Sequence, residues 1–183
     1  MRRTLLTAIM AGLLTIGLIA PAAAQPDRAP APGPDSIAEI AIASGFDELV
    51  GALGYVDSEL GTGLVDLFLN GTDQYTVFAP TDAAFEGLYQ ALGPDVSEIS
   101  DLPPELVRDV LLYHVTEGRR AANSVVPPVR ARSIVTLQGS SLTVTSGGAI
   151  LTASDQQAGF VSGLIDVSAS NGIIHVVDTV LLP

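Results

Sequence analysis

The ten residues Thr76-Val77-Phe78-Ala79-Pro80-Thr81-Asp82-Ala83-Ala84-Phe85 predict a strand that passes directly into a helix. The residues from Tyr75 to Ala79 are mostly β-branched or aromatic, as strands prefer, and Pro80 ends the strand because it has no N–H to donate. Thr81 and Asp82 are expected to cap the helix, since their side-chain oxygens can accept hydrogen bonds from the free N–H groups of its first turn. The apolar face of this helix is formed, at helical spacing, by Phe85, Leu88, Tyr89 and Leu92.

A second decisive stretch closes the chain, Asn171-Gly172-Ile173-Ile174-His175-Val176-Val177-Asp178-Thr179-Val180-Leu181-Leu182-Pro183. Asn171-Gly172 is a strong turn signal. The residues that follow, 173–180, predict a strand with two apolar faces, which indicates burial on both sides.

Between and before these stretches, helical patterns come first. Ser36 and Glu39 form a capping box, with Ser at the N-cap and Glu three helical positions later. Pro103 and Pro104 stand where a helix can begin. The predicted apolar helix faces are Phe46, Leu49, Val50 and Leu53, then residues 64–69, then Val107, Val110, Leu111 and His114.

After Arg132 the pattern changes to alternating, β-branched residues. Gly139-Ser140 and Gly147-Gly148 are turn signals of the hairpin kind. Strands are predicted at residues 134–137, 142–145, 150–153, 160–167 and 173–180. Helices followed by strands, without an internal repeat, predict a single α+β domain.

The first residues predict export. Arg2 and Arg3 precede an apolar run over residues 5–20, and Ala22-Ala23-Ala24 is a small-residue cleavage pattern, so residues 1–24 are interpreted as a signal peptide. A membrane anchor is the alternative, but the run is short and no transmembrane segment is expected in the mature chain. Residues 25–35 predict a Pro/Ala-rich linker, and residues 36–183 the domain.

Composition excludes several partners and chemistries. The chain after residue 24 has six Arg and twenty Asp and Glu, a net charge of −14, which argues against binding to nucleic acid or to an anionic membrane surface. There is no Cys, so disulfides and cysteine-linked lipid are excluded.

Three features, taken in order, resemble the fasciclin (FAS1) domain family: the stretch 76–85, the pair Tyr113-His114, and the terminal stretch 171–183. The resemblance covers nearly all of the chain after residue 35. It implies a β-sandwich or wedge flanked by several α-helices, and roles in cell adhesion, matrix attachment or cell–cell contact. In animal members the Tyr-His pair is linked to integrin recognition, and a bacterial-type export signal argues against an integrin as the partner here.

A search for catalytic and metal-binding patterns is negative. Two His and no Cys cannot build a typical zinc site, and the sequence has no His-Glu-x-x-His, no Gly-x-Ser-x-Gly and no phosphate-binding glycine loop. We therefore expect no enzyme, no metal and no cofactor. A Ser–His–Asp triad assembled from distant residues would make the chain a secreted hydrolase, the weakest alternative.

Most of the family motif residues are expected to be structural. His114 lies on the apolar stripe of its helix and is predicted to be buried and hydrogen-bonded to backbone or a hydroxyl, whereas Tyr113 lies off that stripe and is predicted to be partly exposed. His175 alternates with apolar residues and is predicted to lie in the core. The motif residues interpreted as caps, turn residues or core are Thr76, Phe78, Pro80, Thr81, Asp82, Phe85, Asn171, Gly172, His175 and Asp178.

One cluster of charge is less easily explained as structural. Arg119, Arg120, Arg130 and Arg132 bracket a Pro-rich loop and are four of the six arginines after residue 24. Together with Tyr113 and His114 they are the candidate partner-binding residues. The hypothesis is an anion-recognising patch for an acidic glycan, a phosphate or an acidic partner; the alternative is a solvated loop whose arginines pair with nearby carboxylates.

Two function classes follow. The leading one is a secreted, non-enzymatic interaction module of the periplasm or extracellular space, which binds a protein or surface glycan at the cell envelope and mediates adhesion, aggregation or attachment. The other is a carrier of a small apolar ligand, because some fasciclin-like proteins bind carotenoids in an apolar groove. Aliphatic helix faces could line such a groove.

Overall fold

The computed structural model describes residues 29–183, so the predicted signal peptide and residues 25–28 of the predicted linker lie outside the described residues. The helices are α1 (Ile37–Ala43), α2 (Asp47–Leu60), α3 (Leu64–Asn70), α4 (Asp82–Leu92), the 3-10 helix η1 (Ile99–Asp101), α5 (Pro104–Tyr113) and α6 (Ala122–Val125). The strands are β1 (Tyr75–Pro80), β2 (Val115–Glu117), β3 (Arg132–Val135), β4 (Ser141–Val144), β5 (Ala149–Leu151), β6 (Gln157–Gly159), β7 (Val167–Ala169) and β8 (Gly172–Val177). This is the predicted α+β fold.

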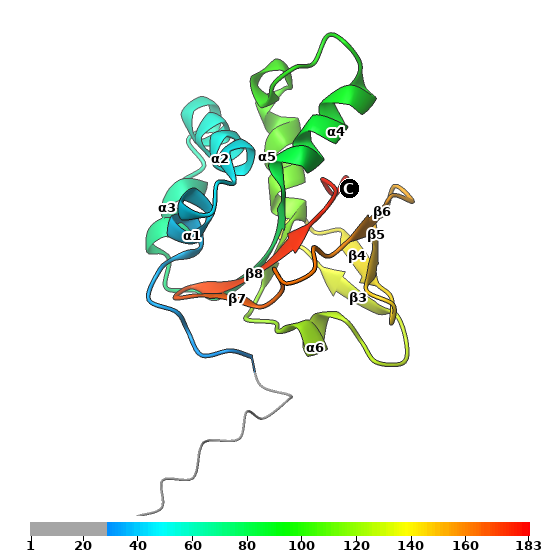
Figure 1. Ribbon diagram of the computed structural model, residues 1–183. Helices are drawn as coiled ribbons and strands as arrows, with labels where there is room; N and C mark the ends of the chain where they lie inside the picture. The colour runs from blue at the N-terminus through cyan, green and yellow to red at the C-terminus, as the bar shows by residue number, and fades with distance from the viewer. Residues whose placement is uncertain (1–28) are drawn as a thin grey trace, which may run out of the picture.

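Two four-stranded sheets form the frame, in the orders β2-β1-β8-β7 and β3-β4-β5-β6. In Figure 1 the helices α1 to α5 lie on one side of the first sheet and the second sheet lies on its other side. The first sheet is therefore the middle layer. The two faces of this layer contribute to two separate hydrophobic cores.

The two stretches that decided the prediction lie side by side as the central strands. β1 pairs with β8 in parallel, from Tyr75 opposite Gly172 to Pro80 opposite Val177. Every residue of both strands is buried. Val77 and Ile174 belong to the core under the helices, and Phe78 belongs to the core under the second sheet. The predicted burial of the last strand on both faces is confirmed.

The helix starts follow the predicted capping chemistry. Thr81 is the N-cap of α4, and its hydroxyl accepts from the N–H of Ala84 at 3.2 Å. The capping box of Ser36 and Glu39 at the start of α1 is complete. Asp82 caps a different helix from the expected one: it accepts at 3.1 Å from the N–H of Glu48 in the first turn of α2. Asp82 thus ties the α4 start to the neighbouring helix.

One predicted strand is wrong. Residues 160–167 do not form a strand; Phe160 makes a single bridge with Val177, and β7 begins only at residue 167. The chain reverses in between, where Gly163 and Asp166 both adopt positive φ. These two turn conformations interrupt the strand that the apolar pattern predicts, and none of residues 160–167 is buried. The short elements η1, β2, α6 and β6 were not predicted.

The segment before α1 packs against the open edge of the first sheet. The N–H of Gly33 donates to the carbonyl of Ala169 in β7 at 3.3 Å, and the N–H of Ser170 donates to the carbonyl of Asp35 at 2.7 Å. Unpaired sheet edges are prone to pair with other chains. Residues 33–35 therefore cover part of an edge that would otherwise be open.

Gly172 allows the central strands to approach each other. A Cβ added there would lie 2.2 Å from the carbonyl oxygen of Tyr75 and 2.7 Å from Cδ1 of Ile37. Sequence analysis assigned Gly172 to a turn, but it is the first residue of β8, and the turn residues are Ser170 and Asn171. Its function is close packing.

We therefore expect Gly172→Ala to destabilise the protein by about 3 kcal/mol, because the backbone contact can be relieved only by separating the central strands. The matched control is Gly51→Ala, at an exposed site within α2 where an added Cβ meets nothing within 4 Å; it should stabilise by about 0.5–1 kcal/mol. Urea unfolding of the two variants measures both changes. Equal urea midpoints for the two variants would show that the close contact between β1 and β8 at Gly172 does not contribute to stability.

Candidate functional site

The candidate site is an apolar groove between α2, α4, η1, α5 and the C-terminal residues, which we call the helix groove. Its cavity volume is about 230 Å³. It is lined by Leu49, Ala52, Pro80, Phe85, Leu88, Leu92, Ile99, Leu102, Leu106, Val107, Val110, Leu111, His114, Val180, Leu182 and Pro183. All but one of these residues are apolar, so the groove can hold an apolar group and supplies almost no polar contacts.

The groove follows from the amphipathic pattern of two helices. The apolar residues of α4 and α5 recur every three or four positions, so each helix presents one apolar face. The inner part of each face is buried, as in Phe85 and Val107. Leu92 and Leu106 are 48% and 49% exposed, so the apolar lining continues to the mouth of the groove.

His114 lies at the base of the groove and is held by two backbone groups. Its Nδ1 donates to the carbonyl of Val110 at 2.7 Å, and its Nε2 accepts from the N–H of Leu181 at 2.9 Å. Burial lowers the pKa of His114 to about 4, so the ring is neutral at pH 7. The prediction of a buried, hydrogen-bonded histidine is confirmed.

His114 also borders a second, smaller apolar cavity of about 60 Å³ beneath α1 and α3. Leu49, Leu111 and His114 line both cavities. These three side chains therefore form the partition between the helix groove and the interior of the helical layer.

The C-terminal residues form one wall of the groove and are held by the second sheet and by α5. The N–H of Leu182 donates to Oε1 of Gln156 at 3.1 Å, and the hydroxyl of Ser154 donates to the carbonyl of Leu182 at 3.1 Å. With the bond from Leu181 to His114, three hydrogen bonds position the last residues of the chain.

The expectation that Tyr113 is partly exposed is wrong. Tyr113 is fully buried in the core beneath the second sheet. Its hydroxyl donates to the carbonyl of Ser141 at 3.1 Å and accepts from the N–H of Ala153 at 3.2 Å. Tyr113 is the last residue of α5, where the chain passes from the helical layer to the middle layer. The apolar stripe of α5 packs in the core under the helices, whereas the Tyr113 side chain reaches the core under the second sheet. Neither residue of the Tyr-His pair reaches the surface.

His175 is also part of the frame. It is fully buried, with its ring beside those of Phe78 and Phe160. Its Nε2 donates to the carbonyl of Arg120 at 2.8 Å, and its Nδ1 accepts from the N–H of Asp166 at 3.2 Å. Burial lowers the pKa of His175. It is a core residue, as predicted.

The arrangement of the two histidines leaves no catalytic triad among residues 29–183. Each ring nitrogen bonds to a backbone group, and neither ring contacts a hydroxyl or a carboxylate through a hydrogen bond. Nor do these residues contain a group of three or more His, Asp or Glu side chains that could hold a metal ion.

The four arginines do not form one patch. Arg119 is turned toward β7 and β8: its guanidinium donates to the carbonyls of Gly172 at 2.6 Å, Ala169 at 2.9 Å and Pro30 at 3.1 Å. Arg120 donates from Nε to the carbonyl of Glu117. These two arginines thus bind backbone carbonyls of the protein itself.

Arg130 and Arg132 lie apart from that pair: Arg130 is in the exposed loop between α6 and β3, and Arg132 is the exposed first residue of β3. One guanidinium nitrogen of Arg132 donates to the carbonyl of Ser124. Within residues 29–183, Arg108 makes the only ion pair, with Asp109 at 2.8 Å. The alternative interpretation, in which the loop arginines pair with carboxylates of the same chain, is therefore not what the described residues show.

The remaining motif residues connect elements. The Thr76 hydroxyl donates to the carbonyl of Gly118 and accepts from the N–H of Arg120. The side chain of Asn171 accepts from the N–H of Ile37 and donates to the carbonyl of Phe68, both at 2.8 Å. Asp178 accepts from the N–H of Gly159 at 2.8 Å, which joins β6 to the end of β8.

The helix groove is not predicted by the sequence. Its residues were predicted as the apolar faces of separate helices, and a helix face that lines a groove has the same periodicity as one that is fully packed. The one available signal was the unusual continuation of the apolar face of α4 to its last residue, Leu92.

The geometry defines a class: a helix-flanked α+β wedge of two sheets with an apolar groove and a frame tied together by buried polar residues. The FAS1 domain pair from the insect cell adhesion molecule fasciclin I has a similar fold, with a TM-score of 0.51 at 16% identity. That match covers 74% of this chain and 45% of the solved chain. The fasciclin domain model matches residues 53–183, and the chain belongs to this family.

Relatives from two kinds of organism support the assignment. The immunogenic protein MPB70 of Mycobacterium bovis is 34% identical over 176 residues, which are 91% of this chain and 82% of MPB70. The cell surface glycolipoprotein MPB83 of the same species is 36% identical over 66% of this chain and 48% of its own length. The transforming growth factor-beta-induced protein ig-h3 of Sus scrofa is 32% identical over 65% of this chain, but only 16% of that protein is matched. In residues 29–183 no helix is both long and apolar enough to cross a membrane.

We expect His114 to make the free energy of unfolding decrease as the pH falls. Its pKa falls from 6.5 to about 4 on folding, so the unfolded chain binds more protons between these values. The associated stability is present above pH 6.5 and is lost as the pH falls toward 4, by about 3 kcal/mol in total. His114→Gln keeps one donor and one acceptor without the titration, and should flatten the dependence of unfolding free energy on pH over this range.

Urea unfolding at a series of pH values measures this difference. Subtracting the two curves isolates His114, because the contribution of His175, which has the same direction, is present in both proteins. If the two curves were parallel, the neutral state assigned to His114 in the folded protein would be wrong.

Proposed function

We propose that this chain is an exported, non-enzymatic interaction module that mediates attachment or aggregation at the cell envelope or in the surrounding matrix. The helix groove carries the proposal: it is open, almost wholly apolar and contains one neutral histidine. Such a surface binds by excluding water, and both ring nitrogens of its histidine are already bonded to backbone groups. Burial of the apolar rim residues by a partner is therefore its simplest use.

The names of the related proteins agree with this proposal. One relative is a cell surface glycolipoprotein and one structural neighbour is part of a cell adhesion molecule. A role in the periplasm or extracellular space would also fit the strongly acidic composition, with pI about 4.2, since high net charge keeps a protein soluble. The partner we propose is a protein or a surface glycan of the envelope.

We expect beads coated with the protein to attach to envelope preparations of the host, and the double variant Leu92→Asp/Leu106→Asp to lose most of this attachment. Both leucines are about half exposed at the groove mouth, so charges there repel apolar partners without disturbing the core. The matched control is Leu164→Asp, which is 44% exposed and does not line the groove. Attachment that is equal for all three proteins would exclude the groove as the site.

A second function is favoured by the same groove, namely transport or storage of a small apolar ligand. The lining residues have the character of a ligand pocket, and the cavity of about 230 Å³ would bury part of an elongated molecule. The smaller cavity beyond Leu49, Leu111 and His114 provides room into which such a molecule would extend if these side chains moved.

For this second function we expect native mass spectrometry of the protein purified from its own host to show a defined additional mass, which is released in organic solvent. The adduct should be absent from the Leu92→Asp/Leu106→Asp variant and present in the Leu164→Asp control. A clean protein mass would exclude the carrier function and leave attachment as the proposal.

A further inference from the structure

The charges of the protein are divided between its two halves. Residues 35–113, which contain α1 to α5, carry fifteen Asp and Glu and one Arg, a net charge of −14. That single arginine is paired with Asp109. Residues 114–183 carry four Arg and four Asp and Glu, a net charge of zero. The helical layer is thus strongly acidic, and the second-sheet half holds the arginines.

The loop of residues 127–132, which we call the arginine loop, is the most exposed apolar and cationic feature of the neutral half. Val129 is 79% exposed, the highest value among the exposed large hydrophobic residues. Arg130 beside it is exposed, and none of residues 29–183 forms an ion pair with it. Pro127 and Pro128 restrict the backbone before Val129, which lowers the entropy lost when the loop binds.

The helix groove has the complementary chemistry. Its lining is apolar. Four exposed carboxylate residues are the immediate sequence neighbours of lining residues in or next to α4, η1 and α5, namely Glu86, Glu98, Asp101 and Glu105. Asp101 accepts hydrogen bonds from the N–H groups of Ser97 and Glu98, which lowers its pKa and keeps it ionised.

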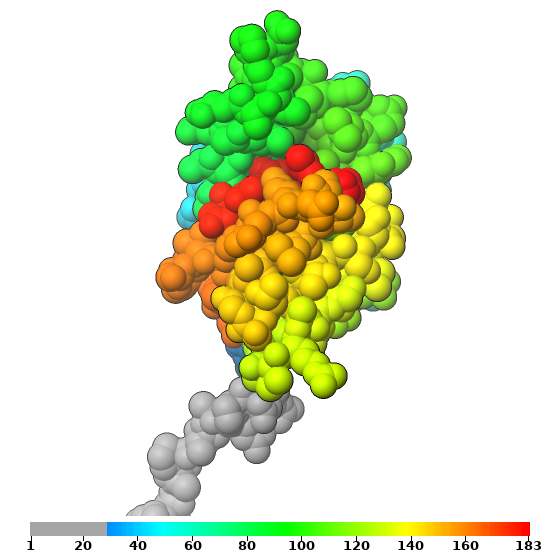
Figure 2. Space-filling model, turned by 90° about the vertical axis from the view of Figure 1, so that its right-hand side faces the viewer, coloured from blue at the N-terminus to red at the C-terminus, as the bar shows by residue number. Residues whose placement is uncertain are grey.

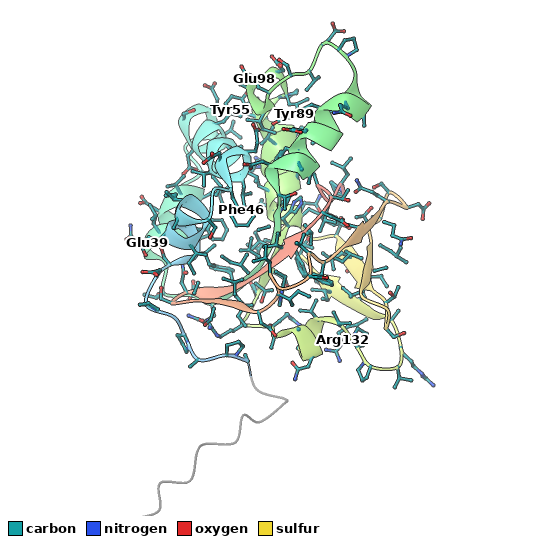
Figure 3. All side chains as sticks on the ribbon, viewed as in Figure 1. Glu39, Phe46, Tyr55, Tyr89, Glu98 and Arg132 are labelled. Carbon is teal, nitrogen blue, oxygen red and sulfur yellow. The ribbon has the colours of Figure 1, made fainter. Side chains whose placement is uncertain are left out.

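The two features cannot meet within one molecule. Figure 3 places Glu98, at the groove end, and Arg132, in the arginine loop, at opposite ends of the protein. In the view of Figure 2 the residues around 130 project from the lower end of the molecule, whereas α4 forms its upper part. Within residues 29–183 the arginine loop therefore cannot reach the groove of its own molecule.

We propose that the arginine loop of one copy inserts Val129 into the helix groove of a second copy, with Arg130 and Arg132 against the carboxylates of the groove rim. This inference rests on the proposed function in attachment or aggregation and names its partner as the protein itself. An exposed apolar residue flanked by two arginines fits an apolar groove flanked by carboxylates, whereas two acidic helical layers repel each other. The association is therefore head to tail.

A head-to-tail contact joins two different surfaces, so each copy keeps one free loop and one free groove. Contacts of this type extend into rings or open chains and are not limited to dimers. Aggregation of cells or surfaces follows directly, because each added copy presents a new site of the same kind.

The test uses two charge-reversal variants of the exported protein. Arg130→Glu/Arg132→Glu makes the loop acidic and leaves the rim unchanged. Glu98→Arg/Glu105→Arg makes the rim basic and leaves the loop unchanged. Each variant alone opposes like charges, and we expect the concentration needed for association to rise at least about tenfold. Mixed in equal amounts, the two variants restore both contacts, and association should return. Sedimentation velocity over a range of protein concentrations measures it.

Two further variants separate the contact from general effects. Asp66→Arg/Asp73→Arg changes the net charge as much as the rim variant does, at exposed sites on and after α3, and should associate like the wild type. Val129→Asp should weaken association at an exposed position that contributes nothing to the core.

The inference is overturned if the wild type is a monomer up to about millimolar concentration, the range of weak specific contacts, or if the mixture associates no better than the separate variants. The bead attachment to host envelope then distinguishes the two proposals. Attachment that persists with a monomeric protein would overturn self-association and leave the proposed function standing with a different partner. A wild-type protein that neither associates with itself nor attaches to the host envelope would overturn both the self-association and the proposed function.

Discussion

The structure depends on the parallel pairing of two strands that are far apart in the sequence. β1 and β8 pair over six residues each, and every one of those residues is buried. Parallel strands cannot be joined by a tight turn, so a long connection has to leave and return. Here that connection contains α4, α5 and the whole second sheet. The arginine loop belongs to this connection, and so do the α4, η1 and α5 walls of the helix groove, whereas α2 and the last residues form its other walls.

A buried central pair creates a second constraint, because the backbone groups at its ends and edges need partners. The family motif residues supply many of them. His114 and His175 each bond two backbone groups, Asn171 bonds the first turn of α1 and the end of α3, and Arg119 binds carbonyls of β7 and β8. No buried side-chain nitrogen or oxygen atom in residues 29–183 lacks a hydrogen-bond partner. The motif is thus explained by satisfaction of buried polar groups, and its residues are committed to the frame.

Prediction from sequence succeeded where one physical signal dominates. A run of strand-favouring residues followed by a capping threonine located β1 and α4. The apolar residues on both faces of the last strand identified β8 as a buried strand. It failed where tertiary contacts decide. Tyr113 lies off its helix stripe, yet a second core receives it, and residues 160–167 look like a strand until Gly163 and Asp166 turn the chain. Nor does any pattern in sequence show that Asp82 would cap the neighbouring helix.

The same reasoning explains why the functional surfaces were the hardest to foresee. The four arginines of one sequence region differ in role, because Arg119 binds carbonyls of β7 and β8, whereas Arg130 lies in an exposed loop. Proximity in sequence therefore says little about shared function. The groove is assembled from α2, α4, η1 and α5, which the fold brings together above the middle layer. Because Thr76, His114, Asn171 and His175 are buried in the frame, the surfaces left for the proposed recognition are the groove and the loops, where residues change without disturbing the central strands. In the proposed association, the unequal distribution of charge between the two halves is what favours contact of the arginine loop with the helix groove over contact of two helical layers.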